Sequence, residues 1–278
     1  MLDRLLFLAA LAFPAPPSAQ DARRPPLDPN CPREGSDRPT GPEWACNGRL
    51  TPAYAFAFVY PASAAQIPAL KAELRAQALR DEFRLAAEAD ALAGRRAPGG
   101  PAVPRLRFDA QWRVDAVTPE LAAASAEIAT YAGGAHGGIE YRAILVDRRD
   151  DRPLRLVDLF EPNLFEHSLL GQRLRGMRAV QAAFCRTLTA MVRERGGEPA
   201  AGVRCPGIED LPVTFLCGPR GRIEAMRAML NPSVAASWGY SSYQVDFPVD
   251  ARMVGNMYRR YRVAFGLPHE RRGRPRPC

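Results

Sequence analysis

Residues 133–138 hold four glycines around one histidine, and they are the part of the sequence whose composition most clearly predicts a special role. Glycine loses much backbone entropy on folding, so we expect positive φ angles or a very close approach to another group. The imidazole of His136 could bind a metal ion or act as a base. A three-histidine metal site is not expected, because His167 falls near a helix start and His269 falls in the tail. We interpret His136 as a structural imidazole that bonds within its own loop.

Two carboxylates flank this glycine loop. Glu127 and Glu140 could face each other across the turn, and such a pair can perform acid/base chemistry in a desolvated pocket. We interpret both as solvated strand residues, because nothing near them in the sequence indicates such a pocket. Nucleophile-elbow, phosphate-loop and zinc-protease motifs do not occur in the chain. The sequence therefore predicts no catalytic residue, metal or cofactor, and the alternative is an envelope polysaccharide hydrolase or transferase using His136 with a nearby carboxylate.

An aromatic, hydroxyl-rich segment follows Asn231 and Pro232. Rigid rings with polar tips suit a protein interface or a surface on which sugars stack. A tryptophan also packs readily into the core of its own protein, so both interpretations remain open. The predicted ligand-binding residues of the two loops are Gly133, Gly134, His136, Trp238, Tyr240 and Tyr243.

The hydrophobic periodicity predicts an α+β fold, in which antiparallel sheets each pack against a long amphipathic helix. We expect two closely associated subdomains, over residues 51–150 and 151–265, and an antiparallel meander rather than a parallel βαβ sheet in the middle of the chain. The expected helices cover residues 67–93, 164–195 and 249–265. The expected strands cover residues 54–60, 108–116, 139–147, 213–217, 223–230 and 243–247, with a further strand through Ile128 into the glycine loop.

Six cysteines fit an oxidising compartment. Cys31 and Cys46 bracket a Pro/Gly-rich segment with no core of its own, so we expect a bridge between them that stabilises the fold by about 3 kcal/mol. Cys185 and Cys205 are expected to pair, because the chain reverses through a Gly/Pro turn between them. The sequence does not define the connectivity of the remaining two cysteines.

Residues 1–19 have the pattern of a secretory signal peptide, with an apolar run too short to span a membrane. We therefore expect a soluble protein, periplasmic or secreted, with a cysteine-stapled lead-in over residues 20–50. Most of the net charge of +8 comes from arginines near the C-terminus, and residues 266–278 are expected to form a basic, disordered tail. This distribution predicts no nucleic-acid partner and only a weak attraction of the tail to anionic surfaces.

Four short segments occur in a distinctive order: Tyr131–Gly137 at the end of a strand, Leu156–Phe160, and, after a long helix, Leu230–Pro232 and Val234–Tyr240. Together they resemble the RsiV/PdaC-type extracytoplasmic domain family. That family occurs in lysozyme-sensing anti-sigma factors, as the C-terminal domain, and as a domain of unknown function ahead of polysaccharide deacetylases. The resemblance spans about residues 52–258 and implies a binding domain, without the cytoplasmic segment or the deacetylase metal set that those other activities need.

We therefore expect a non-enzymatic binding domain that recognises an envelope protein or glycan. The resemblance implies either a lysozyme-like protein or a peptidoglycan fragment as the ligand. Lysozymes of the animal type are cationic, so a basic receptor would repel them unless its body offered an acidic patch.

Overall fold

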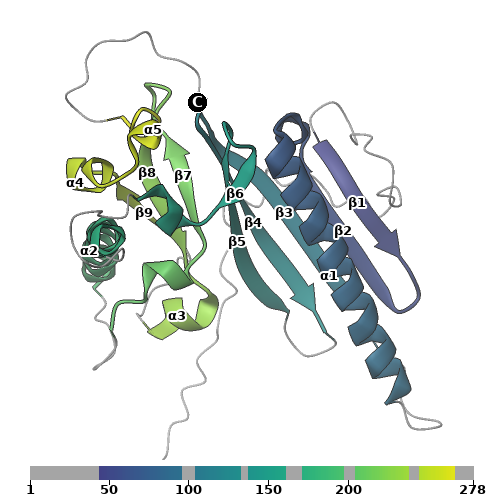
Figure 1. Ribbon diagram of the computed structural model, residues 1–278. Coiled ribbons are helices and arrows are strands. Elements are labelled where there is room, and N and C mark those ends of the chain that lie inside the picture. The colour runs from purple at the N-terminus through teal and green to yellow at the C-terminus, as the bar shows by residue number, and fades with distance from the viewer. Residues whose placement is uncertain are drawn as a thin grey trace, which may run out of the picture.

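The structure is a computed structural model that describes residues 44–95, 104–132, 137–160, 171–196, 204–237 and 244–266. It confirms the α+β class, with one six-stranded and one three-stranded sheet among these residues (Figure 1). The signal-peptide pattern, most of the lead-in and the basic tail lie outside the described residues. The strands are β1 (Trp44–Leu50), β2 (Tyr54–Pro61), β3 (Leu106–Val117), β4 (Leu121–Tyr131), β5 (Gly138–Asp147), β6 (Arg152–Leu154), β7 (Val213–Cys217), β8 (Ile223–Met229) and β9 (Gln244–Pro248). The helices are α1 (Pro68–Gly94), α2 (Gly171–Glu194), α3 (Pro232–Ser237), α4 (Ala251–Gly255) and α5 (Arg259–Arg262), with 3-10 helices η2 (Ala62–Gln66), η3 (Leu156–Leu159) and η4 (Ile208–Asp210).

The first sheet has the strand order β1-β2-β3-β4-β5-β6. Strands β3 to β6 form the predicted antiparallel meander. Strands β2 and β3, however, are parallel, with Tyr54 opposite Leu106, and the prediction of purely antiparallel sheets missed this pair. Its cause is α1, a 27-residue helix that returns the chain to the end where β2 began, so that β3 runs in the same direction (Figure 1).

Strand β1 pairs antiparallel with β2, from Trp44 opposite Pro61 to Leu50 opposite Ala55. The sequence pattern assigns residues 44–50 to the irregular lead-in, so this strand is a correction. Strand β2 is buried along most of its length, and its backbone groups need partners on both sides. Strand β1 supplies them on the side away from β3, and it thereby becomes the edge of the sheet.

Helix α1 covers one face of the first sheet (Figure 1). Leu70 and Leu74 are fully buried in a core that also contains Phe58 and Trp112 from the sheet. The helix predicted over residues 67–93 is therefore confirmed, because its apolar residues recur at the spacing that places them on the face toward the sheet.

The N-terminus of α1 is capped from a distant part of the chain. No side chain next to the helix caps it, and the carboxylate Oδ1 of Asp151 accepts a hydrogen bond from the backbone N–H of Ala69 at 2.7 Å. A negative charge at this position also favours the helix dipole. Asp151 adopts a positive φ of 47°, which aspartate tolerates better than most residues. The β5–β6 turn thus holds the start of α1 in place.

Strand β4 takes part in two hydrophobic cores. Ala122 and Ala124 belong to the core under α1, whereas Leu121 and Ala123 belong to a second core on the other face of the sheet. Successive side chains of a strand point to opposite faces, so a strand that is buried on both sides has no polar alternation over this stretch. The small alanines allow the layers on both faces to approach closely.

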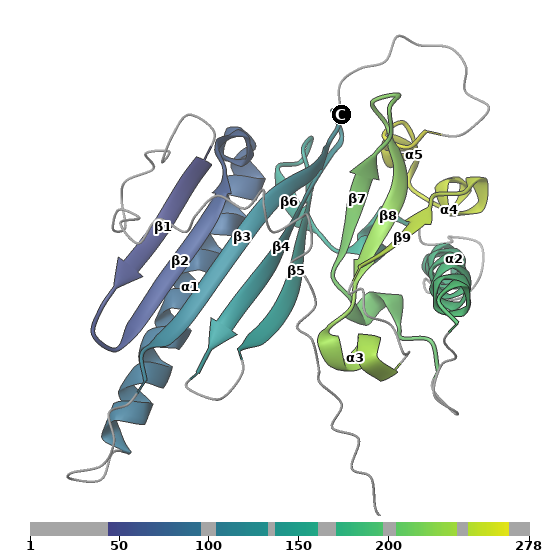
Figure 2. The ribbon, with the colours of Figure 1, turned by 180° about the vertical axis from the view of Figure 1, so that it is seen from behind.

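The second core is formed by residues of the first sheet, the three-stranded sheet β7-β8-β9 and α2. The three-stranded sheet lies in the middle, and α2 lies on its side away from the first sheet (Figures 1 and 2). The predicted hairpin β7–β8 and the last strand β9 are confirmed. Val180, Phe184 and Leu188 of α2 are fully buried, and the ring of Phe184 meets that of Phe247 edge-on. Between the sheets, Thr214 Oγ1 donates a hydrogen bond to Asp115 Oδ2 at 2.7 Å.

The predicted disulfide between Cys185 and Cys205 is confirmed, and it joins α2 to the segment before η4. Gln181 strengthens the same junction, because its Nε2 donates to Pro206 O at 2.7 Å and its Oε1 accepts from the N–H of Ile208 at 2.7 Å. Cys46 and Cys217 each take part in a disulfide as well. The predicted partner of Cys46, Cys31, lies outside the described residues.

The helix predicted over residues 249–265 is wrong, since two short helices, α4 and α5, occupy this region. They are separated because Met257 forms a β-bridge with Phe160 and the N–H of Tyr258 donates to Leu159 O at 2.8 Å. Arginines of α5 therefore belong to the folded body.

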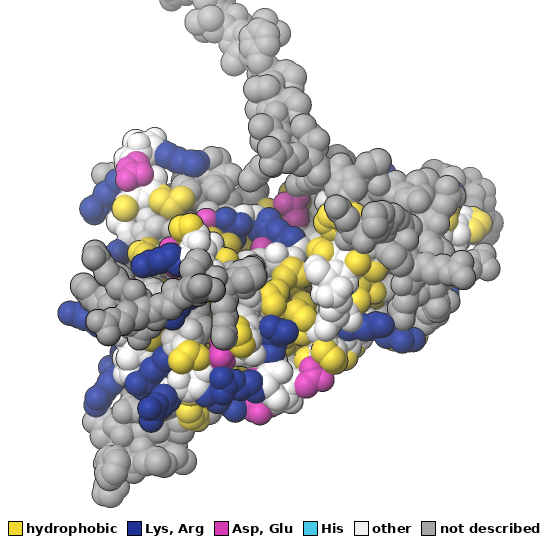
Figure 3. All heavy atoms as spheres, turned by 90° about the horizontal axis from the view of Figure 1, so that it is seen from above, with side chains coloured by type: hydrophobic (Ala, Val, Ile, Leu, Met, Phe, Trp, Pro, Cys, Tyr) yellow, Lys and Arg dark blue, Asp and Glu magenta, His cyan; other side chains and the backbone are white. Residues whose placement is uncertain are grey.

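In the view from above, Lys and Arg side chains are scattered over the surface with acidic side chains among them (Figure 3).

Candidate functional site

The six predicted ligand-binding residues lie outside the described residues. The strand ends that flank the two loops, however, are described. Strand β4 ends at Tyr131 and β5 begins at Gly138, and α3 ends at Ser237 before β9 begins at Gln244. These flanking elements lie at the same end of the two sheets, the lower end in Figure 1. The role of Gly133, Gly134, His136, Trp238, Tyr240 and Tyr243 stays a prediction.

The last two glycines of the cluster are described, and they confirm a close approach. A side chain at Gly137 would place its Cβ 2.7 Å from the backbone oxygen of Thr130, and one at Gly138 would place it 2.8 Å from the Thr130 hydroxyl. Thr130 and Gly138 pair across the hairpin. At these two positions the neighbour that requires glycine is therefore strand β4 of the protein itself.

The possible carboxylate pair of Glu127 and Glu140 does not form. Glu127 lies opposite Tyr141 in the β4–β5 register, and Glu140 lies opposite Ile128, so the two carboxylates are on different faces of the sheet. Glu140 instead makes a two-point ion pair with Arg142, at 2.7 and 3.2 Å. The structure thus excludes acid/base chemistry by this pair.

A pocket with a volume of about 70 Å³ lies between α1 and the edge of the first sheet formed by β1 and β2. This volume is far below that of pockets that enclose a whole small molecule, so the pocket accommodates one functional group of a larger ligand. Its lining residues are Asn47, Gly48, Arg49, Phe56, Tyr60, Lys71, Arg75, Ala78, Leu79 and Glu82.

The lining combines positive charge with an aromatic floor. Arg49, Lys71 and Arg75 are cationic, and Glu82 is the one acidic residue of the lining, with its Oε1 2.8 Å from Arg49 Nε. The ring of Phe56 stacks on that of Phe108 with 5.3 Å between centroids, which fixes the floor. A site with excess guanidinium and ammonium groups over an apolar base favours a carboxylate or another anion with a small apolar substituent.

Local structure explains how these residues meet. In β1, Arg49 lies two positions from Asn47 and therefore points to the same face, toward α1. In α1, Lys71, Arg75 and Leu79 are separated by four residues and share one side of the helix. Sequence reasoning missed the pocket because it treated residues 44–50 as irregular. The available signal was Lys71, the only lysine of the chain, one helical turn before Arg75.

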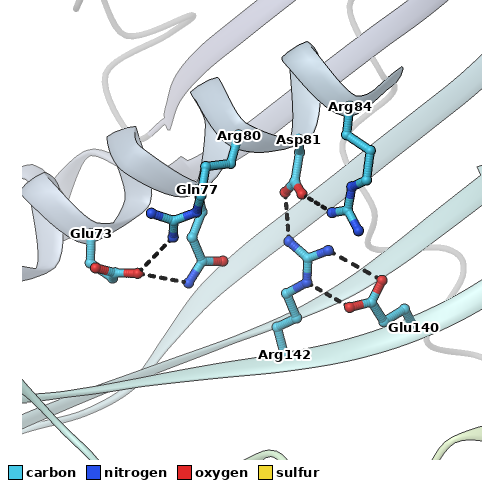
Figure 4. Close-up of polar contacts among 7 residues, drawn as sticks. All are labelled: Glu73, Gln77, Arg80, Asp81, Arg84, Glu140 and Arg142. Atoms are coloured by element: carbon cyan, nitrogen blue, oxygen red, sulfur yellow. Dashed lines mark hydrogen bonds and ion pairs between the residues drawn. The ribbon is translucent and has the colours of Figure 1, made fainter. Parts of the chain in front are cut away.

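Two groups of ion pairs hold α1 on the other side of its axis (Figure 4). Asp81 is only 2% exposed and accepts from Arg142 Nη1 of β5 at 2.6 Å, while Arg84 binds its other oxygen. Burial alone would lower the pKa of Arg142, but its hydrogen bonds to Glu140 and Asp81 raise that pKa above the ordinary value. The guanidinium therefore stays charged, and the cluster fixes the rotation of α1 and with it the wall of the pocket.

The second group lies nearer to the start of the helix. Glu73 accepts from Gln77 Nε2 at 3.3 Å and from Arg80 Nη2 at 3.0 Å (Figure 4). Arg80 is well exposed, so this pair contributes little to stability.

Another charged cluster joins α5 to the last residue of β5. Tyr261 OH donates to Asp147 Oδ2 at 2.6 Å, and Arg260 binds both Tyr261 and Asp147. Burial alone would raise the pKa of Asp147, but the hydrogen bonds from Tyr261 and from two backbone N–H groups, with the charge of Arg260, lower it below the ordinary value. This carboxylate is thus fully engaged within the protein and serves to join the two halves of the fold.

No family model and no curated protein matches the chain. Several solved structures are similar to it, and two of them belong to the DUF3298 family. A DUF3298 family member from Bacteroides fragilis is 15% identical and has a TM-score of 0.47, with 77% of this chain and 92% of that chain covered. A DUF3298 family protein from Pseudomonas aeruginosa is 18% identical and has a TM-score of 0.41, with 81% and 97% covered. The resemblance to the RsiV/PdaC-type family stays a prediction.

Within the described part of the chain, no group of three or more His, Cys, Asp or Glu side chains is arranged to hold a metal ion. In the same ranges, no helix is both long and apolar enough to cross a bilayer.

Proposed function

We propose that this chain is a non-enzymatic binding domain that acts outside the cytoplasm, periplasmic or secreted, and recognises a carboxylate-bearing ligand of the cell envelope. The observation that carries the proposal is the pocket between α1, β1 and β2, with three cations, one acid and an aromatic floor. The signal-peptide pattern and the disulfide between Cys185 and Cys205 support export to an oxidising compartment.

The charge of the pocket favours one of the two expected ligands. Peptidoglycan fragments carry carboxylates on their stem peptides, and Arg49, Lys71 and Arg75 attract such groups. A cationic lysozyme would meet like charge at the same place. The small volume is consistent with a single carboxylate inside the pocket and the rest of the fragment outside.

The test is calorimetric titration of the mature chain with soluble, peptide-bearing peptidoglycan fragments. We expect binding that weakens as salt rises, because the contact is electrostatic and partly exposed. Arg75→Glu should weaken it by about tenfold or more, since a charge-assisted hydrogen bond is replaced by repulsion.

Arg178→Glu is the matched control, because Arg178 is also an exposed helical arginine but lies on α2. It should bind as the unchanged chain does. Equal loss in both variants would locate the effect in net charge rather than in the pocket and would refute the site. If the chain bound purified lysozyme and not the fragments, the ligand would be a lysozyme-like protein rather than a peptidoglycan fragment. Binding of neither would refute the proposed function.

A further inference from the structure

Helix α1 carries an exposed apolar stripe on the side that faces away from the sheet. Its centre is formed by Leu79 and Phe83, whose side chains are 43% and 77% exposed. Phe83 is the most exposed of the large apolar residues in the described part of the chain. Single exposed apolar residues are common, but here they belong to a pattern. The stripe consists of Ala72, Ala76, Leu79, Phe83, Ala86 and Asp90. Ala86 lies at its border and also packs against the core under α1, and Leu79 also borders the pocket.

The spacing of the stripe is that of a helix–helix seam. Its positions alternate in steps of four and three residues, which keeps them on one side of a helix as in a coiled coil. They lie opposite Leu70, Leu74 and Leu85, which face the sheet. The three alanines allow a second helix to approach closely, and the two large residues at the centre provide the apolar contact.

The stripe is complementary to itself when two copies run antiparallel. With the two-fold axis beside residue 81, Leu79 of one copy meets Phe83 of the other, and Ala76 meets Ala86. In the same register Ala72 lies opposite Asp90. One surface then serves both partners, which is the requirement for a closed, isologous dimer.

The charges at the two ends match the same antiparallel register. Lys71 and Arg75 flank the N-terminal end of the stripe, and Asp90 lies at its C-terminal end. Asp90 of one copy would therefore lie beside Lys71 and Arg75 of the other. A parallel arrangement would instead place each charge next to its own kind.

We infer that the outer face of α1 is a docking surface for a second copy of this chain. The two helices pack antiparallel through Leu79 and Phe83, and Asp90 contacts the cations at the other end. One helical stripe offers less area than a stable permanent dimer needs, so the dimer is weak and forms at high protein concentration. This inference concerns assembly and does not rest on the proposed ligand. Lys71 and Arg75 also line the pocket, so the dimer and the ligand compete for these two cations.

Sedimentation equilibrium of the mature chain tests the inference without any ligand. We expect a monomer–dimer equilibrium for the unchanged chain and a monomer for Phe83→Glu at every concentration. Val263→Glu is the matched control, because Val263 is 55% exposed and lies just after α5. It should dimerise like the unchanged chain. A chain that remains monomeric at its highest soluble concentration, or a dimer that survives Phe83→Glu, would overturn the inference.

A charge exchange tests the register. Asp90→Arg should raise the dissociation constant by about tenfold, because the two-fold axis makes each substitution act twice. Adding Arg75→Asp should restore the original affinity. Restoration supports the antiparallel pairing, whereas a double variant that dimerises no better than Asp90→Arg would contradict it.

Discussion

At the scale of single residues, Tyr261 shows how one side chain makes stability depend on pH. Burial, together with the adjacent Asp147 carboxylate, raises its pKa from 10 to about 12. The folded state therefore favours the protonated phenol. This contribution is fully present below pH 10, the pKa of tyrosine in the unfolded chain, and is lost as the pH rises to about 12.

Tyr261→Phe should remove this contribution. We expect the variant to be about 1–3 kcal/mol less stable at pH 8, because Asp147 loses a charge-assisted hydrogen bond. Urea unfolding between pH 8 and 12 measures the effect, and the steep loss above pH 10 should be smaller in the variant. Tyr258→Phe is the control, since the ring of Tyr258 packs edge-on against Tyr261. A pH profile of Tyr261→Phe that parallels the unchanged chain would disprove the assignment.

At the scale of elements, the position of α2 depends on Gly176. A Cβ at this position would overlap the ring of Phe160, which is fully buried at the junction with Met257. Gly176→Ala should lower the free energy of unfolding by about 1–3 kcal/mol through overpacking, although alanine favours helices.

Gly94→Ala provides the comparison, because the last residue of α1 has open space where its Cβ would lie. It should be neutral or slightly stabilising, which chemical denaturation of both variants can establish. Similar midpoints for the two variants would show that α2 moves away from Phe160 at little cost.

At the scale of the whole molecule, the two cores share strand β4, so we expect them to unfold together. Replacing Cys185 and Cys205 by serine should cost about 3 kcal/mol, the value for a loop of this size. Far- and near-ultraviolet circular dichroism should still give coincident transitions at a lower denaturant concentration. A second half that unfolds separately in this variant would argue against coupling through β4.

Some elements of the fold could be predicted from the hydrophobic periodicity of the sequence, and others could not. Helix α1 and the hairpin β7–β8 were predictable because their side-chain periods report directly which face is buried. The break between α4 and α5 was not, because it depends on a backbone pairing of Met257 with Phe160, almost a hundred residues earlier. Strand β1 was hidden for a similar reason, since an edge strand is defined by the neighbour that it pairs with.

The candidate pocket, too, depends on contacts between distant segments that a local sequence pattern does not indicate. Residue types along the chain were sufficient for the α+β class, the bridge between Cys185 and Cys205 and the need for glycine at Gly137 and Gly138, because each reflects a local backbone or packing requirement. The meeting of Arg49 with Lys71 and Arg75 required the folded arrangement of β1 and α1. Contacts between segments depend on strand order and helix rotation, which are set by the burial of both cores at once rather than by any short stretch of sequence.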